Sequence, residues 1–129
     1  RARRVVAIGG GKGGIGKSLV SANLGIALAE RGSKVVLVDA DLGGANLHTC
    51  LGVAQPRVSL SDFVEKRVDR LEDVVVPTGI ERLELISGAM DELDAANPKR
   101  CRSRMRRWLG ISKAGASCSQ ARLCCRWRN

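Results

Sequence analysis

With 129 residues, the chain is long enough for one small domain with a hydrophobic core and short for two. Its formal net charge of +9 would favour a nucleic-acid or anionic-membrane partner if the charge were evenly spread. Residues 1–98, however, hold twelve Lys/Arg and thirteen Asp/Glu, whereas residues 99–129 hold ten Lys/Arg and no acid. The composition therefore excludes a uniformly basic body and leaves nucleic-acid binding as a possibility for the tail alone.

Membrane-spanning and exported classes are also disfavoured. No apolar run reaches the roughly 18 residues that a membrane span needs, and the run after the basic N-terminus is too short for a signal peptide. The body holds a single cysteine, Cys50, which is typical of a reducing cytoplasm. The tail cysteines lack C-x-x-C spacing and His48 is the only histidine, so no zinc site is expected. We expect a cytoplasmic protein.

The first forty residues predict a strand, a helix and a second strand. Residues 4–8 form a continuous apolar run that is typical of a buried parallel strand. Residues 18–31 predict a helix that Gly32 ends, and residues 34–38 predict a second buried strand. This order is a βαβ unit with a right-handed crossover.

The later elements are shorter. We expect a helical turn within 45–51, a short helix capped by Ser59 or Ser61, another turn at 69–73, and strands at 74–76 and 82–86 that form a hairpin. A helix beginning in 91–96 and a boundary at Asn97-Pro98 follow. Beyond that the sequence has no clean period, apart from a possible basic helical turn at 104–109.

A glycine-rich loop joins the first strand to the first helix. Residues 11–18 match G-x-x-x-x-G-K-[ST], in which backbone N–H groups and the positive end of the next helix face a phosphate. Lys17 would reach the β- and γ-phosphates, and the Ser18 hydroxyl would ligate Mg²⁺. The predicted nucleotide-binding residues are Gly11, Lys12, Gly13, Gly14, Ile15, Gly16, Lys17 and Ser18.

A dinucleotide-binding Rossmann module is the alternative. Gly9, Gly11 and Gly14 also fit G-x-G-x-x-G, and Asp39 lies where such a fold carries its ribose-binding acid. This alternative leaves Lys17 and Ser18 without a role, so it is the weaker of the two.

Two acids follow the second strand. Asp39 and Asp41 would lie at the carboxyl edge of the sheet with the glycine loop. One of them could hold the hydration shell of Mg²⁺ and the other could orient an attacking water. The structural alternative is that either acid only caps the next turn. For Lys12, position alone leaves open a solvated loop residue or a charge near the phosphates.

These segments resemble a known family. Residues 12–18 resemble the deviant Walker A motif of the MinD/ParA class of P-loop ATPases, and residues 38–47 resemble the switch I segment of that class. Residues 85–88 resemble the strand that later reaches the nucleotide pocket. The run from Asn46 to Gly52 is most similar to flagellar-number regulators of the FlhG/FleN type. The resemblance covers residues 3–98.

The resemblance implies an α/β P-loop NTPase fold, with a mostly parallel sheet and flanking helices, that binds ATP and Mg²⁺ as an ATPase. Lys12 would be the signature lysine that reaches the partner's phosphates in an ATP-sandwiched homodimer. Asp39 would act on Mg²⁺ through water, and Asp41 would position the hydrolytic water. ATP would close the dimer and hydrolysis would open it. Partners would be a second copy and a protein of flagellar, division or partition positioning, with membrane contact only through a C-terminal segment absent from this chain.

The tail departs from the family. After Ile86 no apolar run followed by Asp occurs, so the acid-ending strand that the family needs next is missing. Loss of all acids with gain of Arg, Cys and Trp is typical of an out-of-frame tail on a truncated ATPase; a genuine basic tail that touches nucleic acid or lipid is the alternative. We therefore divide the chain into an ATPase part, 1–98, and an irregular tail, 99–129. We expect nucleotide binding with poor hydrolysis, and an open sheet edge beside the first strand.

Overall fold

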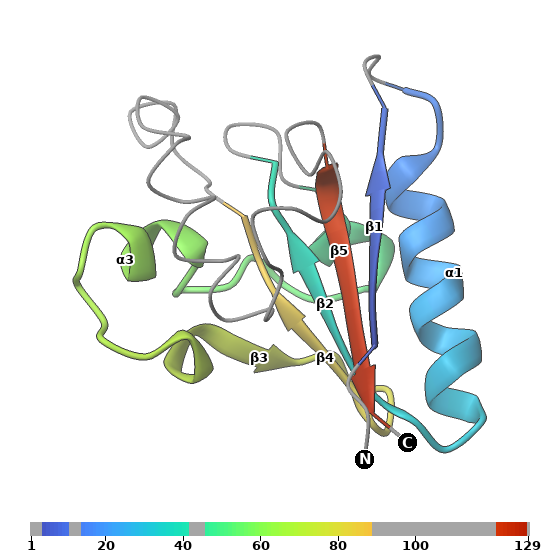
Figure 1. Cartoon of the computed structure of the whole chain (residues 1–129). Coiled ribbons are helices and arrows are strands. Elements are labelled where there is room, and N and C mark those ends of the chain that lie inside the picture. Colours follow the sequence, from blue (N-terminus) through green and yellow to red (C-terminus); the bar gives the residue numbers. More distant parts are fainter. Residues whose placement is uncertain (1–3, 11–13, 42–45, 89–120, 129) are drawn as a thin grey trace.

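The computed structural model describes residues 4–10, 14–41, 46–88 and 121–128 (Figure 1). These residues form a five-stranded sheet with helices on both faces, which confirms the predicted α/β class. The elements in chain order are β1 (Arg4–Gly9), α1 (Lys17–Glu30), β2 (Lys34–Asp39), α2 (Leu47–Cys50), α3 (Leu60–Val64), the 3-10 helix η1 (Leu71–Val74), β3 (Val75–Pro77), β4 (Leu83–Ile86) and β5 (Ala121–Arg128).

The sheet is mixed, with the strand order β1-β5-β2-β4-β3. β5 is antiparallel to both β1 and β2, and β2 is parallel to β4, so β1, β2 and β4 run in one direction. These three strands are the parallel part that the sequence predicts. β3 is antiparallel to β4, with Val75 opposite Ile86, which confirms the predicted hairpin.

The position of β5 was not foreseeable from the pattern of the tail. This strand lies between β1 and β2, with Arg4 opposite Trp127 and Lys34 opposite Arg128 (Figure 1). The facing edges of β1 and β2 present backbone N–H and C=O groups, and an extended segment can pair with them whatever its side-chain period. Residues 121–128 thus differ from the expected irregular tail. The assignment of 99–129 as foreign to the domain stays a prediction.

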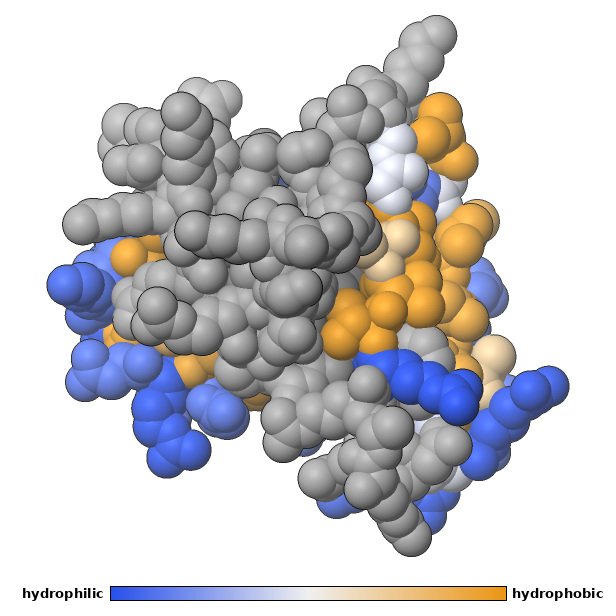
Figure 2. All heavy atoms as spheres, in the orientation of Figure 1, coloured by the Kyte–Doolittle hydropathy of each residue, from blue (hydrophilic) through white to orange (hydrophobic). Residues whose placement is uncertain are grey.

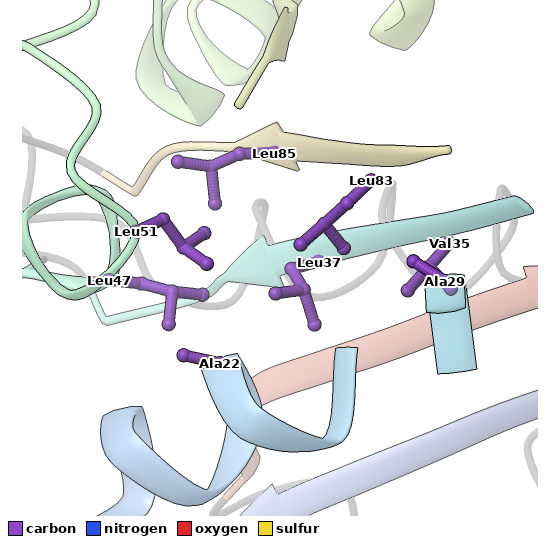
Figure 3. Close-up of a cluster of buried hydrophobic side chains, with 8 residues drawn as sticks. All are labelled: Ala22, Ala29, Val35, Leu37, Leu47, Leu51, Leu83 and Leu85. Carbon is purple, nitrogen blue, oxygen red and sulfur yellow. The ribbon is translucent and has the colours of Figure 1, made fainter. Parts of the chain in front are cut away.

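Alternate residues of the central strands face two different cores. On one face Leu37 of β2 and Leu85 of β4 pack with residues of α1 and α2; Figure 3 shows this cluster, which is made of Ala22, Ala29, Val35, Leu37, Leu47, Leu51, Leu83 and Leu85. On the other face Val38 and Ile86 pack with α3 and η1. Burial on both faces explains why these strands are continuous apolar runs rather than alternating ones.

The helix α1 begins and ends within one residue of the prediction. At its end Gly32 adopts φ 88°, its N–H donates to Ala29, and the N–H of Ser33 donates to Leu28, which is the Schellman arrangement. In its middle Gly25 approaches β2 so closely that a Cβ there would lie 2.8 Å from Leu37 Cδ1. The glycine therefore sets how near α1 lies to the sheet.

The short elements lie where the sequence predicts them, although the type of helix differs in one case. Ser59 is the N-cap of α3: its side chain accepts from the N–H of Ser61 while its own N–H donates to Asp62. The turn predicted at 69–73 is the 3-10 helix η1. The helices predicted in 91–96 and 104–109 lie outside the described residues. Within the described part of the chain, every helix falls short of the length and apolarity required to cross a membrane.

Candidate functional site

The glycine loop between β1 and α1 is described from Gly14 onward. Gly14 and Gly16 adopt φ values of 75° and 85°, the left-handed region that glycine enters without strain. Gly10 lies so close to Ile15 that a Cβ on it would come within 2.6 Å of Ile15 Cδ1. The backbone angles therefore favour glycine at positions 14 and 16, whereas the contact at Gly10 is with the end of an exposed side chain that can move. Gly11, Lys12 and Gly13 lie outside the described residues, so the predicted role of Lys12 is untested.

The first turn of α1 offers hydrogen-bond donors rather than a finished cap. The N-cap is Gly16, which has no side chain to bond the first amides, and the first turn contains no acidic residue. Its opening N–H groups and the positive end of the helix macrodipole are therefore suited to an anion. Lys17 and Ser18, both half-buried, belong to this same turn.

Ser18 is joined to the segment that follows β2. Its hydroxyl donates a hydrogen bond of 2.8 Å to Oδ1 of Asn46, which is the residue before α2. Asn46 is not among the predicted site residues, although it lies within the 38–47 segment that resembles switch I. Its position before the helical turn at Leu47 predicts an N-cap rather than a partner for Ser18.

Asp39 ends β2 and is buried, with 2% of its surface exposed. Its Oδ1 accepts from the N–H of Asp41 at 3.0 Å, and its Oδ2 accepts from the N–H of Leu47 at 3.1 Å. The carboxylate thus holds both ends of the segment between β2 and α2, as the capping alternative expects. The Asn46 amide also bonds this carboxylate. A carboxylate offers about four lone-pair sites on its two oxygens, so it can still accept a hydrogen bond from a water molecule bound to Mg²⁺.

Burial also changes the chemistry of Asp39. It raises the pKa of the carboxyl to about 6, while the hydrogen bonds from the Asp41 and Leu47 amides act in the opposite direction. The group is ionised at pH 7 but titrates close to it. Asp41 lies beside it, half-buried; its predicted role in placing a water stays a prediction.

The loop and the acids lie at one edge of the sheet, as the sequence predicts. Ile8 and Asp39 both lie opposite Leu123 of β5, so they occupy one row across the sheet. Two strand spacings separate them, which is roughly 10 Å. The edge thus brings together amide donors, a hydroxyl and carboxylates, and these oxygen ligands and donors fit a magnesium-bound phosphate.

Hydrophobic side chains surround the start of α1. Ile15, Leu19 and Val20 expose 57%, 63% and 57% of their surfaces. Figure 2 shows hydrophobic surface over the part of the molecule that α1 occupies, on the right of the view. An apolar surface of this kind beside a polar loop is typical of a contact with another macromolecule.

The ParA family profile, described as NUBPL iron-transfer P-loop NTPase, matches residues 1–102. The chain belongs to the ParA family. This membership confirms the MinD/ParA resemblance and favours the P-loop interpretation of residues 11–18 over the dinucleotide alternative. The matched residues include the loop, Asp39, Asp41 and Asn46.

Three ParA-family relatives show the range of the similarity. The antiactivator FleN of Pseudomonas aeruginosa is 46% identical over 87 residues, which is 66% of this chain and 30% of FleN. The iron-sulfur cluster carrier protein of Aquifex aeolicus is 46% identical over 61 residues, 47% of this chain and 17% of the carrier. The septum site-determining protein MinD of Pyrococcus horikoshii, solved in complex with Mg-ADP, has a TM-score of 0.65 and 36% identity, covering 84% of this chain and 42% of MinD. The chain spans less than half the length of each.

Proposed function

We propose that residues 11–18 bind the phosphates of Mg-ATP, and that the intact protein is an ATP-driven switch of the MinD/ParA type. The observation that carries this proposal is the shared edge of the sheet, where the uncapped start of α1, the Ser18 hydroxyl and the Asp39 carboxylate lie together. The Mg-ADP bound to the similar MinD structure supports the same ligand here.

Each residue would have one task. The amides of the first turn of α1 and the ammonium of Lys17 would hold the phosphates. Ser18 would ligate Mg²⁺ directly and Asp39 would hold it through water; when bound, the ion neutralises charge on the phosphate oxygens. Asp41 would orient the attacking water. Lys12 would reach the phosphates held by a second copy.

ATP-dependent pairing of two copies is the proposed switch. The exposed Ile15, Leu19 and Val20 beside the loop support it, because a second copy could bury them together with the nucleotide. We expect slow hydrolysis from this chain, because residues 87–129 contain no apolar run that ends in Asp. The similarity to the antiactivator FleN supports control of flagellar number or placement, and the similarity to MinD supports a role in cell-division or partition positioning; either role would involve a protein partner.

Binding of a fluorescent ATP analogue to the full chain tests the proposal. We expect Mg²⁺-dependent binding that Lys17→Ala weakens at least tenfold. Lys34→Ala is the matched control, because Lys34 is exposed and begins β2 at the opposite edge of the sheet. Binding of NAD(H) without Mg²⁺, unaffected by Lys17→Ala, would instead support a dinucleotide module. Salt-sensitive DNA binding that disappears on removal of residues 100–129 would support a nucleic-acid role for the tail.

A further inference from the structure

The hydrogen bond between Ser18 and Asn46 joins residues 28 positions apart in the sequence. It is exposed to solvent. An exposed hydrogen bond between neutral side chains contributes little to stability, since water competes for both groups. The Ser18–Asn46 hydrogen bond therefore contributes little to the stability of the domain. Its location in the proposed magnesium site points to a role in metal binding instead.

We propose, on the basis of the proposed function, that Asn46 is a positioning residue for the magnesium ligand Ser18. A hydroxyl has one proton to donate and two lone pairs to offer. A cation can take only a lone pair, so the proton of a ligating hydroxyl needs an acceptor elsewhere. Asn46 Oδ1 is that acceptor in this structure, and a hydroxyl held this way would keep its lone pairs available to the ion.

Asn46 is held in place by its neighbour in the chain. The N–H of Leu47 donates to the buried Asp39 carboxylate, and the Leu47 side chain is fully buried in the core cluster that also contains Ala22 of α1 (Figure 3). Ser18 lies one turn before Ala22 on the same helix. The two partners therefore extend from elements that are packed against one another, which fixes the geometry of their hydrogen bond.

The arrangement couples the metal to the segment after β2. The ligand Ser18 contacts Asn46, and the adjacent Leu47 contacts Asp39, whose other oxygen holds Asp41. Loss of the Asn46 acceptor would remove the link between Ser18 and this chain of hydrogen bonds. The proposal therefore predicts that Asn46 raises nucleotide affinity only when Mg²⁺ is present. It should not change the affinity for metal-free nucleotide.

The test compares ATP-analogue affinity in Mg²⁺ with affinity in EDTA for the full chain and three variants. The ratio of the two dissociation constants is the magnesium gain. We expect Asn46→Ala to lower this gain about tenfold with the EDTA affinity unchanged, and Asn46→Asp, which keeps an acceptor at the same place, to retain it. The matched control is Asn23→Ala, because Asn23 is an exposed residue of α1 whose side chain bonds the Leu19 carbonyl of its own helix. Mn²⁺ bound to each variant, measured by electron paramagnetic resonance with ADP present, gives a second readout and should follow the same order.

The outcomes separate this inference from the proposed function. A magnesium gain in Asn46→Ala equal to that of the unchanged chain would overturn the role of Asn46 and leave the proposed function intact. The role of Asn46 is also overturned if Asn46→Ala loses affinity equally in Mg²⁺ and EDTA, since that is the result of a structural role. If the chain without substitutions binds the ATP analogue equally well in Mg²⁺ and in EDTA, the role of Asn46 and the proposed function are both overturned.

Discussion

Ile8 of β1 and Asp39 of β2 lie in the same row of the sheet because both face Leu123 of β5. The distance between the glycine loop and the acids is therefore set by a strand from the basic tail. β5 uses both edges of its backbone, one toward β1 and the other toward β2. Any change that removes β5 acts on the site as well as on the sheet.

A proline in the middle of β5 tests this relationship. Cys125 lies opposite Val6 on one side and Leu37 on the other, so its backbone is within both ladders. Proline removes a ladder N–H and is not tolerated in a central strand. We expect Cys125→Pro to lower the free energy of unfolding by about 2 kcal/mol or more in urea titrations, whereas Cys125→Val, a good strand former, should change it little. Equal midpoints for the two variants would mean that β5 does not pair with β1 and β2.

Gly25 gives a second test, on the packing of α1. An alanine Cβ there would lie 2.8 Å from Cδ1 of the fully buried Leu37. We expect Gly25→Ala to destabilise the chain by about 1–2 kcal/mol despite the better helix propensity of alanine, because the core would be overpacked. Leu37→Val removes the opposing methyl, so in that background the same substitution should cost less. A double-mutant cycle by chemical unfolding measures the difference, and an additive cycle would contradict the contact.

The raised pKa of Asp39 predicts a pH dependence of stability. The folded pKa of about 6 lies above the value of about 4 expected in the unfolded chain, so the folded state holds this proton more tightly. The contribution of Asp39 to stability is thus complete below about pH 4 and is lost as the pH rises to about 6, by up to about 3 kcal/mol. Unfolding free energies measured from pH 4 to 7 should show this fall, and Asp39→Asn should flatten it.

The matched control for that series is Asp73→Asn, because Asp73 is exposed in η1. It should leave the slope of the unchanged chain intact. If the unfolding free energies of Asp39→Asn and of the unchanged chain fall in parallel from pH 4 to 7, a group other than Asp39 causes the pH dependence.

The capping box of α3 is the subject of a fourth prediction. The Ser59 hydroxyl accepts from the Ser61 amide at 3.2 Å, and the Asp62 carboxylate accepts from the Ser59 amide at 2.8 Å. Removing the hydroxyl in Ser59→Ala should cost about 1 kcal/mol, and Ser59→Thr should restore most of it. Thermal unfolding measures both variants. Equal losses in the two would show that the hydroxyl is not the stabilising group.

The parts of the fold that the sequence predicts are those with a local cause. β1 and β2 are apolar runs, Gly32 ends α1 with a left-handed residue, and residues 11–18 match a loop whose geometry depends on its glycines. The site was predictable to the same extent, since Ser18 and Asp39 follow from motif and strand end.

What could not be predicted depends on distant partners. β5 has no hydrophobic period, and it pairs with strands more than eighty residues before it. Asn46 becomes a partner of Ser18 only once α2 has docked beside α1, and the close approach at Gly25 exists only where Leu37 faces it. No pattern within a window of ten or twenty residues contains that information.

The place of β5 also has a consequence for how the chain folds. Arg4, at the start of the first strand, pairs with Trp127, near the last residue, and the two ends of the chain lie together in Figure 1. Contacts this far apart in sequence must close a loop of almost the whole chain, which slows folding. Among the strands that the structure describes, β1 pairs with β5 alone, so during synthesis it lacks this partner until residues 121–128 have left the ribosome. For that interval its apolar edge is open to other chains, so the yield of folded protein should fall steeply with concentration and with slower translation of the tail.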